Sequence, residues 1–208
     1  VSLENVSFSP DDTWIREIEY LVIPECVLVE DDYKPDGIGG RIIQFYLRYR
    51  ASDDKAQISV FNIADYKRAF AHYPQYIGNR DSELLALINN PSKLKRYGLE
   101  SPPHFRWMDA SQTFYAKAAK LDFGRGLLVV TQISQDAFIT ISNENLRFLY
   151  QGFTSNGEYF VEMDLPVELK GLDDTSDQFG PGADWGSPEH EAVYNRHILT
   201  TADRIDKA

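Results

Sequence analysis

Hydrophobic and polar residues alternate in a strand-like pattern over much of the second half of the chain, from residue 113 to residue 167. Residues 127–130 are apolar on both faces, which indicates a strand that is covered from both sides. Residues 158–165 alternate instead, and the two faces carry Tyr159, Val161, Met163 and Leu165 on one side and Glu158, Phe160, Glu162 and Asp164 on the other. Asn156 and Gly157 tolerate positive φ at both turn positions, so we expect a tight hairpin before this strand. The segment is therefore predicted to be an antiparallel β-meander, with the acidic side chains forming a solvated outer face.

Extended segments at residues 6–8 and 14–23, a pair of shorter strands and two or three helices are predicted ahead of this meander. Residues 41–49 and 57–62 each alternate with a period of two and are joined by a polar turn, which predicts a hairpin. The spacing of apolar residues then becomes helical over residues 64–73 and 81–88. This change of period within one segment is typical of helices packed beside a sheet.

The last part of the chain is predicted to contain an irregular acidic loop and a helix. Residues 172–186 are rich in Asp, Gly and Pro, whereas Ser187 is followed by a proline and a glutamate, the order expected at a helix start. The helix is predicted over residues 188–206, with a thin apolar stripe that consists of Tyr194, Ile198, Thr201 and Ile205. We therefore predict a single α+β domain over residues 1–208, mainly an antiparallel sheet with two or three middle helices and a C-terminal helix.

The charge and the hydropathy pattern exclude two kinds of environment. The formal net charge is −11, and no basic run is longer than residues 93–96, whereas phosphate backbones attract clusters of Lys and Arg. We therefore expect no binding to nucleic acid. No apolar window approaches the ~18 residues that a membrane-spanning helix needs, so we expect no transmembrane segment. The chain begins with Val1 rather than methionine, and we expect that an upstream segment has been removed.

The short motifs of the chain predict structure rather than chemistry. Asp122, Phe123 and Gly124 match the magnesium loop of kinases in three letters, but the phosphate loop and the catalytic loop are missing, so the triplet is interpreted as a hairpin turn. The four histidines lack the three- or four-residue spacing of zinc ligands on a helix, and the acidic run at 173–177 departs from a calcium loop. We predict no metal, no cofactor and no identifiable catalytic residue.

A hydrolase is an alternative, with an acid and a base supplied by separate strands. Glu158 and Glu162 lie four residues apart on one strand, roughly 13 Å, which exceeds the ~5–9.5 Å between the carboxylates of glycosidases. A partner from elsewhere, such as His104 beside Glu162 or Asp164, would complete the pair. Because the sequence does not reveal this partner, it favours a non-catalytic protein over an enzyme.

Aromatic residues near the C-terminus are the candidate binding residues. Phe179, Trp185 and Tyr194 lie in or beside the irregular segment, and exposed aromatic side chains supply binding surface. We predict a non-catalytic binding or interaction domain whose partner is a protein or a small-molecule ligand. A structural subunit that docks through its C-terminal helix is a further alternative.

The meander also carries several short blocks in a fixed order. They are Phe114-Tyr115-Ala116, Leu121-Asp122-Phe123-Gly124, Ile141-Ser142-Asn143-Glu144-Asn145-Leu146, Tyr150-Gln151-Gly152-Phe153 and Leu165-Pro166-Val167. In this order the blocks resemble a family of uncharacterised bacterial proteins that are typically secreted or lipid-anchored. The resemblance implies an extracytoplasmic location and brings no activity with it.

Overall fold

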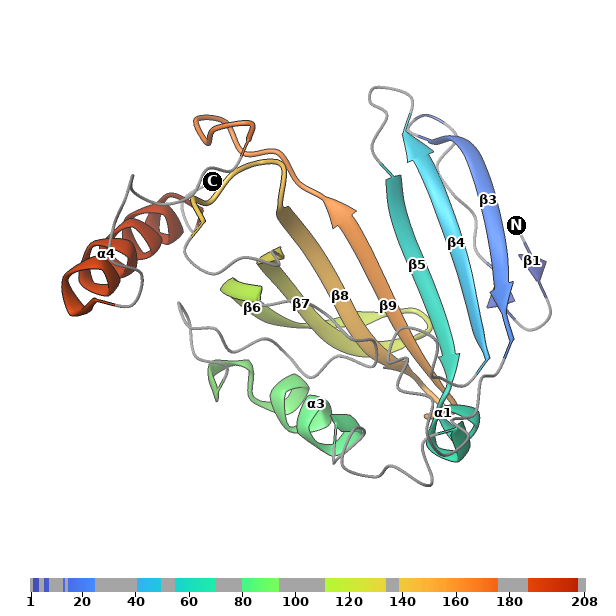
Figure 1. The fold of residues 1–208 in the computed structure, drawn as a ribbon. Helices are drawn as coiled ribbons and strands as arrows, with labels where there is room; N and C mark the ends of the chain where they lie inside the picture. Colours follow the sequence, from blue (N-terminus) through green and yellow to red (C-terminus); the bar gives the residue numbers. More distant parts are fainter. Residues whose placement is uncertain are drawn as a thin grey trace, which may run out of the picture.

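The computed structural model describes residues 2–3, 6–7, 13, 15–24, 41–49, 55–69, 80–93, 111–133, 139–175 and 187–205. Over these residues the chain forms one α+β domain, in which helices lie against a seven-stranded antiparallel sheet (Figure 1). The predicted fold class is confirmed, including the helices in the middle of the chain and the helix near its C-terminus.

The sheet joins two meanders at its centre. Its strands follow the order β3 (Ile15–Ile23), β4 (Ile42–Tyr49), β5 (Lys55–Asn62), β9 (Tyr159–Pro166), β8 (Leu146–Thr154), β7 (Gly124–Ile133) and β6 (Ser111–Leu121). The first three strands are consecutive in the chain, and so are the last four. The two meanders meet where β5 pairs with β9, with Phe61 opposite Phe160. A separate short pair is formed by β1 (Ser2–Leu3) and β2 (Val6–Ser7).

Two helices cover one face of the sheet. Helix α1 (Ile63–Ala69) follows β5 directly, because the side chain of Asn62 accepts a hydrogen bond from the backbone N–H of Asp65 at 3.1 Å and caps the helix. Helix α3 (Arg80–Asn89) is followed by the 3₁₀ turn η2 (Pro91–Lys93). An ion pair of 2.6 Å between Lys67 and Asp81 links the two helices.

The sheet has a hydrophobic core on each face. Between the sheet and the two helices, Phe160 contacts Phe61 and Phe153 with ring centroids 5.6 and 5.8 Å apart, and Tyr66 and Leu84 pack against the same cluster. The core of the opposite face consists of Ile43, Phe45, Leu47, Ala56, Val60, Tyr150 and Val161. The centre of the sheet is therefore covered on both sides, as the apolar run at residues 127–130 predicts for β7.

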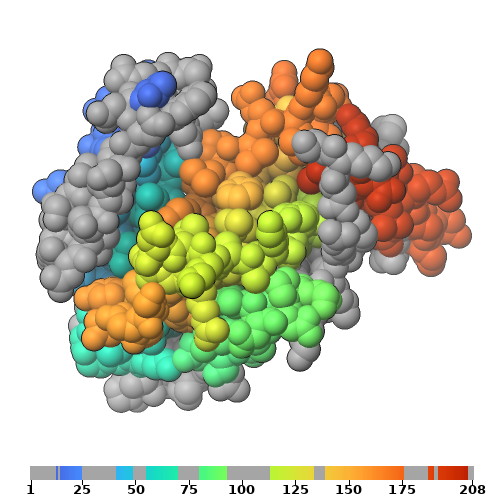
Figure 2. Space-filling model, turned by 180° about the vertical axis from the view of Figure 1, so that it is seen from behind, coloured from blue at the N-terminus to red at the C-terminus, as the bar shows by residue number. Residues whose placement is uncertain are grey.

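Helix α4 (Pro188–Ile205) packs at one end of the molecule through the predicted stripe (Figures 1 and 2). Tyr194 and Ile198 are buried against Phe114 and Leu146. The helix covers residues 188–205 of the predicted range 188–206, and residue 206 lies outside the described residues. Of the predicted acidic loop at 172–186, the described part ends at residue 175. No helix in the described part of the chain combines the length and the apolar character needed to cross a bilayer.

The β6–β7 connection is the two-residue hairpin turn that the motif predicts. The turn consists of Asp122 and Phe123, with Leu121 paired to Gly124. Glycine is required at position 124 by close approach, since a Cβ there would fall on the backbone carbonyl of Phe153 in the next strand. The identity of this triplet is thus explained by strand packing.

The β8–β9 connection is the hairpin turn predicted at Asn156 and Gly157. Gly157 has the expected positive φ of 73°, but four residues, 155–158, separate the two strands. The side chain of Asn156 accepts a hydrogen bond from the backbone N–H of Glu158 at 3.1 Å and closes the turn. The expected hairpin is therefore present, and its connection has four residues because Asn156 forms a side-chain turn of its own.

A tyrosine lies across two paired glycines on the face opposite the helices. Gly126 of β7 is opposite Gly152 of β8, and a Cβ at Gly126 would lie 2.6 Å from ring atoms of Tyr150. The edge of the Tyr150 ring also meets Phe123, with centroids 5.8 Å apart. The glycines therefore provide the space in which the Tyr150 ring lies flat on the sheet.

Candidate functional site

A row of polar side chains crosses the centre of the sheet on the face that carries Phe61. Gln44 is opposite Ser59, Ser59 is opposite Glu162, and Glu162 is opposite Gln151. Directly opposed residues of antiparallel strands project to the same face, and all four side chains are buried. These four residues, from the adjacent strands β4, β5, β9 and β8 (Figure 1), are called the buried polar row below.

Hydrogen bonds join neighbouring members of the buried polar row. Gln151 donates from Nε2 to Oε2 of Glu162 at 3.2 Å, and Gln44 donates from Nε2 to Oγ of Ser59 at 3.5 Å. Burial of a polar group is unfavourable unless it is hydrogen-bonded. These contacts therefore offset part of the cost of burial and fix the side chains in one arrangement.

The position of Glu162 corrects the prediction of a solvated outer face. Glu158 is exposed, but Glu162 is 5% exposed and Asp164 is half-buried. The alternation of residues 158–165 identifies the face correctly but does not show what covers it. Glu162 is buried because β9 lies at the centre of the sheet rather than at its edge.

A second polar row lies beside the first, nearer to solvent. Tyr46 is opposite Gln57, and Gln57 is opposite Asp164. The hydroxyl of Tyr46 donates to Oε1 of Gln44 at 2.9 Å, and Nε2 of Gln57 donates to Oγ of Ser59 at 2.8 Å. Tyr46, Gln57 and Asp164 are called the outer polar row, and two of its members, Tyr46 and Gln57, are hydrogen-bonded to the buried polar row.

Two arginines border the outer polar row. The guanidinium of Arg147 lies 3.9 Å from the carboxylate of Asp164. Arg48 forms ion pairs of 3.3 and 3.6 Å with Glu17 and Glu19 of β3. The two polar rows together with Arg48 and Arg147 are called the polar face, and its accessible margin carries both charge signs.

Tyr66 of α1 connects the polar face to the helices. Its pKa is raised to about 12, chiefly by burial, while the Arg80 charge and a hydrogen bond with Arg80 lower it and the Glu162 charge raises it. Tyr66 is therefore protonated at neutral pH. The charge of Glu162 in the polar face thus acts on Tyr66 of α1.

The chemistry of the polar face is that of a hydrogen-bonding surface. Its amide, hydroxyl, guanidinium and carboxylate groups supply both donors and acceptors. Within the described residues no group of three or more His, Cys, Asp or Glu side chains is arranged to hold a metal ion. The donors and acceptors of the polar face can form hydrogen bonds with a polar organic ligand.

The predicted binding residues do not belong to the polar face. Phe179 and Trp185 lie outside the described residues, as does His104 of the predicted acid–base pair. Tyr194 is 5% exposed, and its hydroxyl donates to the backbone carbonyl of Ile139 at 3.2 Å. Tyr194 thus has a packing role in the structure, and the binding role of the three aromatic residues stays a prediction.

The stripe of α4 that was considered for docking to a partner is used inside the molecule. Tyr194 and Ile198 are buried in the same cluster as Phe114. The large apolar side chains that α4 leaves exposed, among its described residues, are Val193 and Leu199. Docking through the predicted stripe would therefore require α4 to leave the sheet.

Comparison of the chain with family models, with curated proteins and with solved structures gives no match. The family resemblance of residues 113–167 therefore stays a prediction. The function of the polar face is inferred below from its own geometry.

Sequence reasoning missed three of the four residues of the buried polar row. The three missed residues are Gln44, Ser59 and Gln151. Their uncharged side chains do not by themselves indicate a site, and no recognisable motif surrounds them. The signal that was present is a polar residue inside an otherwise apolar strand, as for Gln151 within residues 148–153. Such a residue indicates a buried hydrogen-bond partner, but the sequence does not identify that partner.

Proposed function

We propose that the protein is a non-catalytic, extracytoplasmic binding domain that holds a neutral, hydroxyl-rich ligand, of the carbohydrate class, on the polar face. The observation that supports this is the outer polar row, in which Tyr46, Gln57 and Asp164 lie in register across three adjacent strands and are only partly buried. A ligand with many hydroxyl groups requires donors and acceptors together, and the polar face offers both. The extracytoplasmic location rests on the resemblance of residues 113–167.

The hydrogen bonds within the polar face favour binding. Gln57 and Tyr46 are already held by Ser59 and Gln44 beneath them. A side chain that is fixed before binding loses little conformational entropy when the ligand arrives. Polar groups that stay unpaired when the wrong ligand is present also give such a site its selectivity.

The first test is binding of neutral di- to tetrasaccharides, measured by isothermal titration calorimetry. We expect at least one of them to bind with a dissociation constant tighter than about 1 mM. Replacement of an outer group, by Gln57→Leu or Arg147→Gln, is expected to weaken binding about tenfold, because each removes a donor from the accessible margin. Glu158→Gln, on the exposed β8–β9 turn, is the control and should bind as the unmodified protein does. Absence of binding throughout the panel, or equal binding by all variants, would contradict the proposal.

A hydrolase is the second candidate, supported by the burial of Glu162. Glu162 and Asp164 are two residues apart on one face of β9, roughly 7 Å along the strand. That separation falls within the range used by paired carboxylates of glycosidases. Release of nitrophenol from chromogenic glycosides, abolished by Glu162→Gln but not by Glu158→Gln, would favour the hydrolase over the binding domain.

A further inference from the structure

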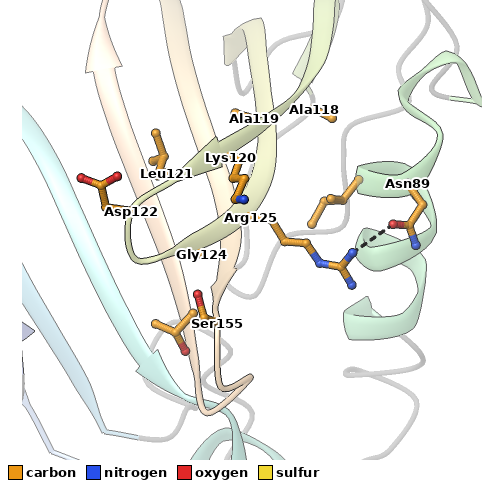
Figure 3. A pocket seen from close by; sticks show the side chains of 11 residues that line it. Asn89, Ala118, Ala119, Lys120, Leu121, Asp122, Gly124, Arg125 and Ser155 are labelled. Carbon is orange, nitrogen blue, oxygen red and sulfur yellow. Dashed lines mark hydrogen bonds between the residues drawn. The ribbon is translucent and has the colours of Figure 1, made fainter.

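A hollow lies away from the polar face, at the tip of the β6–β7 hairpin. Its cavity volume is about 520 Å³, within the range of small-molecule sites. It lies between the end of α3, the hairpin and the β8–β9 turn (Figure 3). In the opposite view of the molecule, α3 packs beside this hairpin (Figure 2). Three separate elements therefore build its walls.

Two cationic side chains project into this hollow from neighbouring strands. Lys120 of β6 is directly opposite Arg125 of β7, so both lie on the same face, with Cβ atoms about 5 Å apart. Like charges at directly opposed positions destabilise a strand pair. An anion placed between them would remove that repulsion.

Neighbouring residues fix the side chain of Arg125 but leave that of Lys120 unpaired within the described part of the chain. Nη1 of Arg125 donates to Oδ1 of Asn89 at 3.2 Å, and this contact directs the guanidinium toward the end of α3 (Figure 3). The amide oxygen of Asn89 is uncharged, so it does not neutralise Arg125. Lys120 forms no hydrogen bond or ion pair with another described residue, and Asp122 at the other side of the hollow forms no ion pair with either cation.

The remaining walls are partly apolar. Ile88 contributes from α3, and Ala118, which shares a sheet face with Lys120, contributes from the hairpin. In a protein with a net charge of −11, long-range electrostatics repel anions, so a bound anion must gain its affinity from local contacts. A charged head beside Lys120 and Arg125 and an apolar body against these walls would provide both kinds of contact.

We propose that this hollow is a binding site for a small organic anion, with a carboxylate or phosphate head held by Lys120 and Arg125. The site is separate from the polar face and independent of the ligand proposed there. Its binding is expected to weaken with salt, because the contact is between charges at an accessible site.

The test is calorimetric titration of the full chain with phenyl phosphate at low ionic strength. Phenol, which has the body without the charge, is titrated in parallel. We expect phenyl phosphate to bind with a dissociation constant of about 1 mM or tighter and phenol to bind at least about tenfold more weakly. Benzoate in place of phenyl phosphate distinguishes a carboxylate site from a phosphate site.

Three variants locate the site. Lys120→Gln with Arg125→Gln should weaken binding of phenyl phosphate at least about tenfold, and Lys120→Gln alone should weaken it by a smaller factor. Lys117→Gln is the matched control, because Lys117 is exposed on the same strand but projects from the opposite face. Circular dichroism checks that each variant is folded, and Lys120→Gln alters an exposed side chain, so the fold should persist. Equal affinity of the double variant and the unmodified protein, or no binding of either anion, would overturn the proposal.

Discussion

At the scale of single residues, the molecule contains buried polar atoms whose contacts differ sharply. Gln151 is buried completely and donates to the carboxylate of Glu162. The hydroxyl of Tyr150 is also buried but has no hydrogen-bond partner in the described part of the chain. These differences lead to opposite expectations for substitutions that remove polar atoms.

Gln151→Ala is expected to lower the free energy of unfolding by about 2–4 kcal/mol. The substitution leaves a cavity in the centre of the sheet and removes an amide donor from a buried carboxylate. Urea denaturation monitored by circular dichroism measures the change. Glu158→Ala, at an exposed position, serves as the control and should change the stability by less than about 0.5 kcal/mol.

Tyr150→Phe is expected to leave the stability unchanged or to raise it by up to about 1 kcal/mol, because it removes a buried hydroxyl without breaking a hydrogen bond. Burial also raises the pKa of Tyr150 to about 12, so the hydroxyl is neutral at ordinary pH and loses no charge interaction. Tyr194→Phe is the matched comparison. It breaks the hydrogen bond to Ile139 and should lower the stability by about 1 kcal/mol. A larger loss for Tyr150→Phe than for Tyr194→Phe in the same denaturation experiment would contradict this account.

At the scale of elements, helix α4 is held to the sheet by polar contacts as well as by its apolar stripe. Nε2 of His197 accepts a hydrogen bond from the backbone N–H of Ile141 at 3.3 Å. Near the C-terminal end of the helix, a guanidinium nitrogen of Arg204 donates a hydrogen bond to the backbone carbonyl of Gly171. The contact at His197 requires an unprotonated ring nitrogen, which makes the docking of α4 sensitive to pH.

The stability contributed by His197 is expected to decrease on acidification. Burial lowers the pKa of His197 below its usual 6.5, with Asp173 raising it and Arg204 lowering it. Between pH 6.5 and the lower pKa of the folded state, the unfolded chain binds a proton that the folded chain does not, so the free energy of unfolding falls as the pH falls. Above pH 6.5 this contribution is fully present.

Urea denaturation at pH 7.5 and pH 5 measures this effect. His197→Gln retains a side-chain acceptor but cannot take up a proton, so the variant should lose less stability between the two pH values than the unmodified protein. An equal loss in both proteins would show that His197 is not responsible.

The comparison between sequence and structure is clearest for the strands. The period-two pattern identified β4, β5 and the meander from β6 to β9, and the composition of residues 122–124 identified a turn. The pattern did not reveal that β5 pairs with β9, since about a hundred residues separate them and a period of two carries no information about the neighbouring strand. The burial of Glu162 depends on that pairing. The sequence pattern therefore does not predict it.

At the scale of the whole molecule, the pairing of β5 with β9 places these strands at the centre of the sheet and leaves β3 and β6 at its edges. Tyr20 and Leu21 of β3 are strongly exposed, whereas Val60 and Phe160 of the central strands are buried. Local opening is therefore easier at β3 than at the centre.

Hydrogen exchange monitored by mass spectrometry is expected to show this difference. Amides of β5, β8 and β9 should exchange at least about tenfold more slowly than those of β3, because they are released only by opening of the central sheet. Equal protection of β3 and β9 would show that the sheet opens as one unit.

The seam between β5 and β9 also divides the chain into two parts that are each incomplete. The N-terminal part contains strands β3 to β5 and helices α1 and α3. The C-terminal part contains strands β6 to β9 and helix α4. Helix α3 belongs to the first part but packs on β6 and β7 of the second, so each part supplies a surface that the other lacks. If the chain were cut between Lys93 and Ser111, the two fragments should associate when mixed, and the protein would then serve as a complementation pair that reports the proximity of two fused partners.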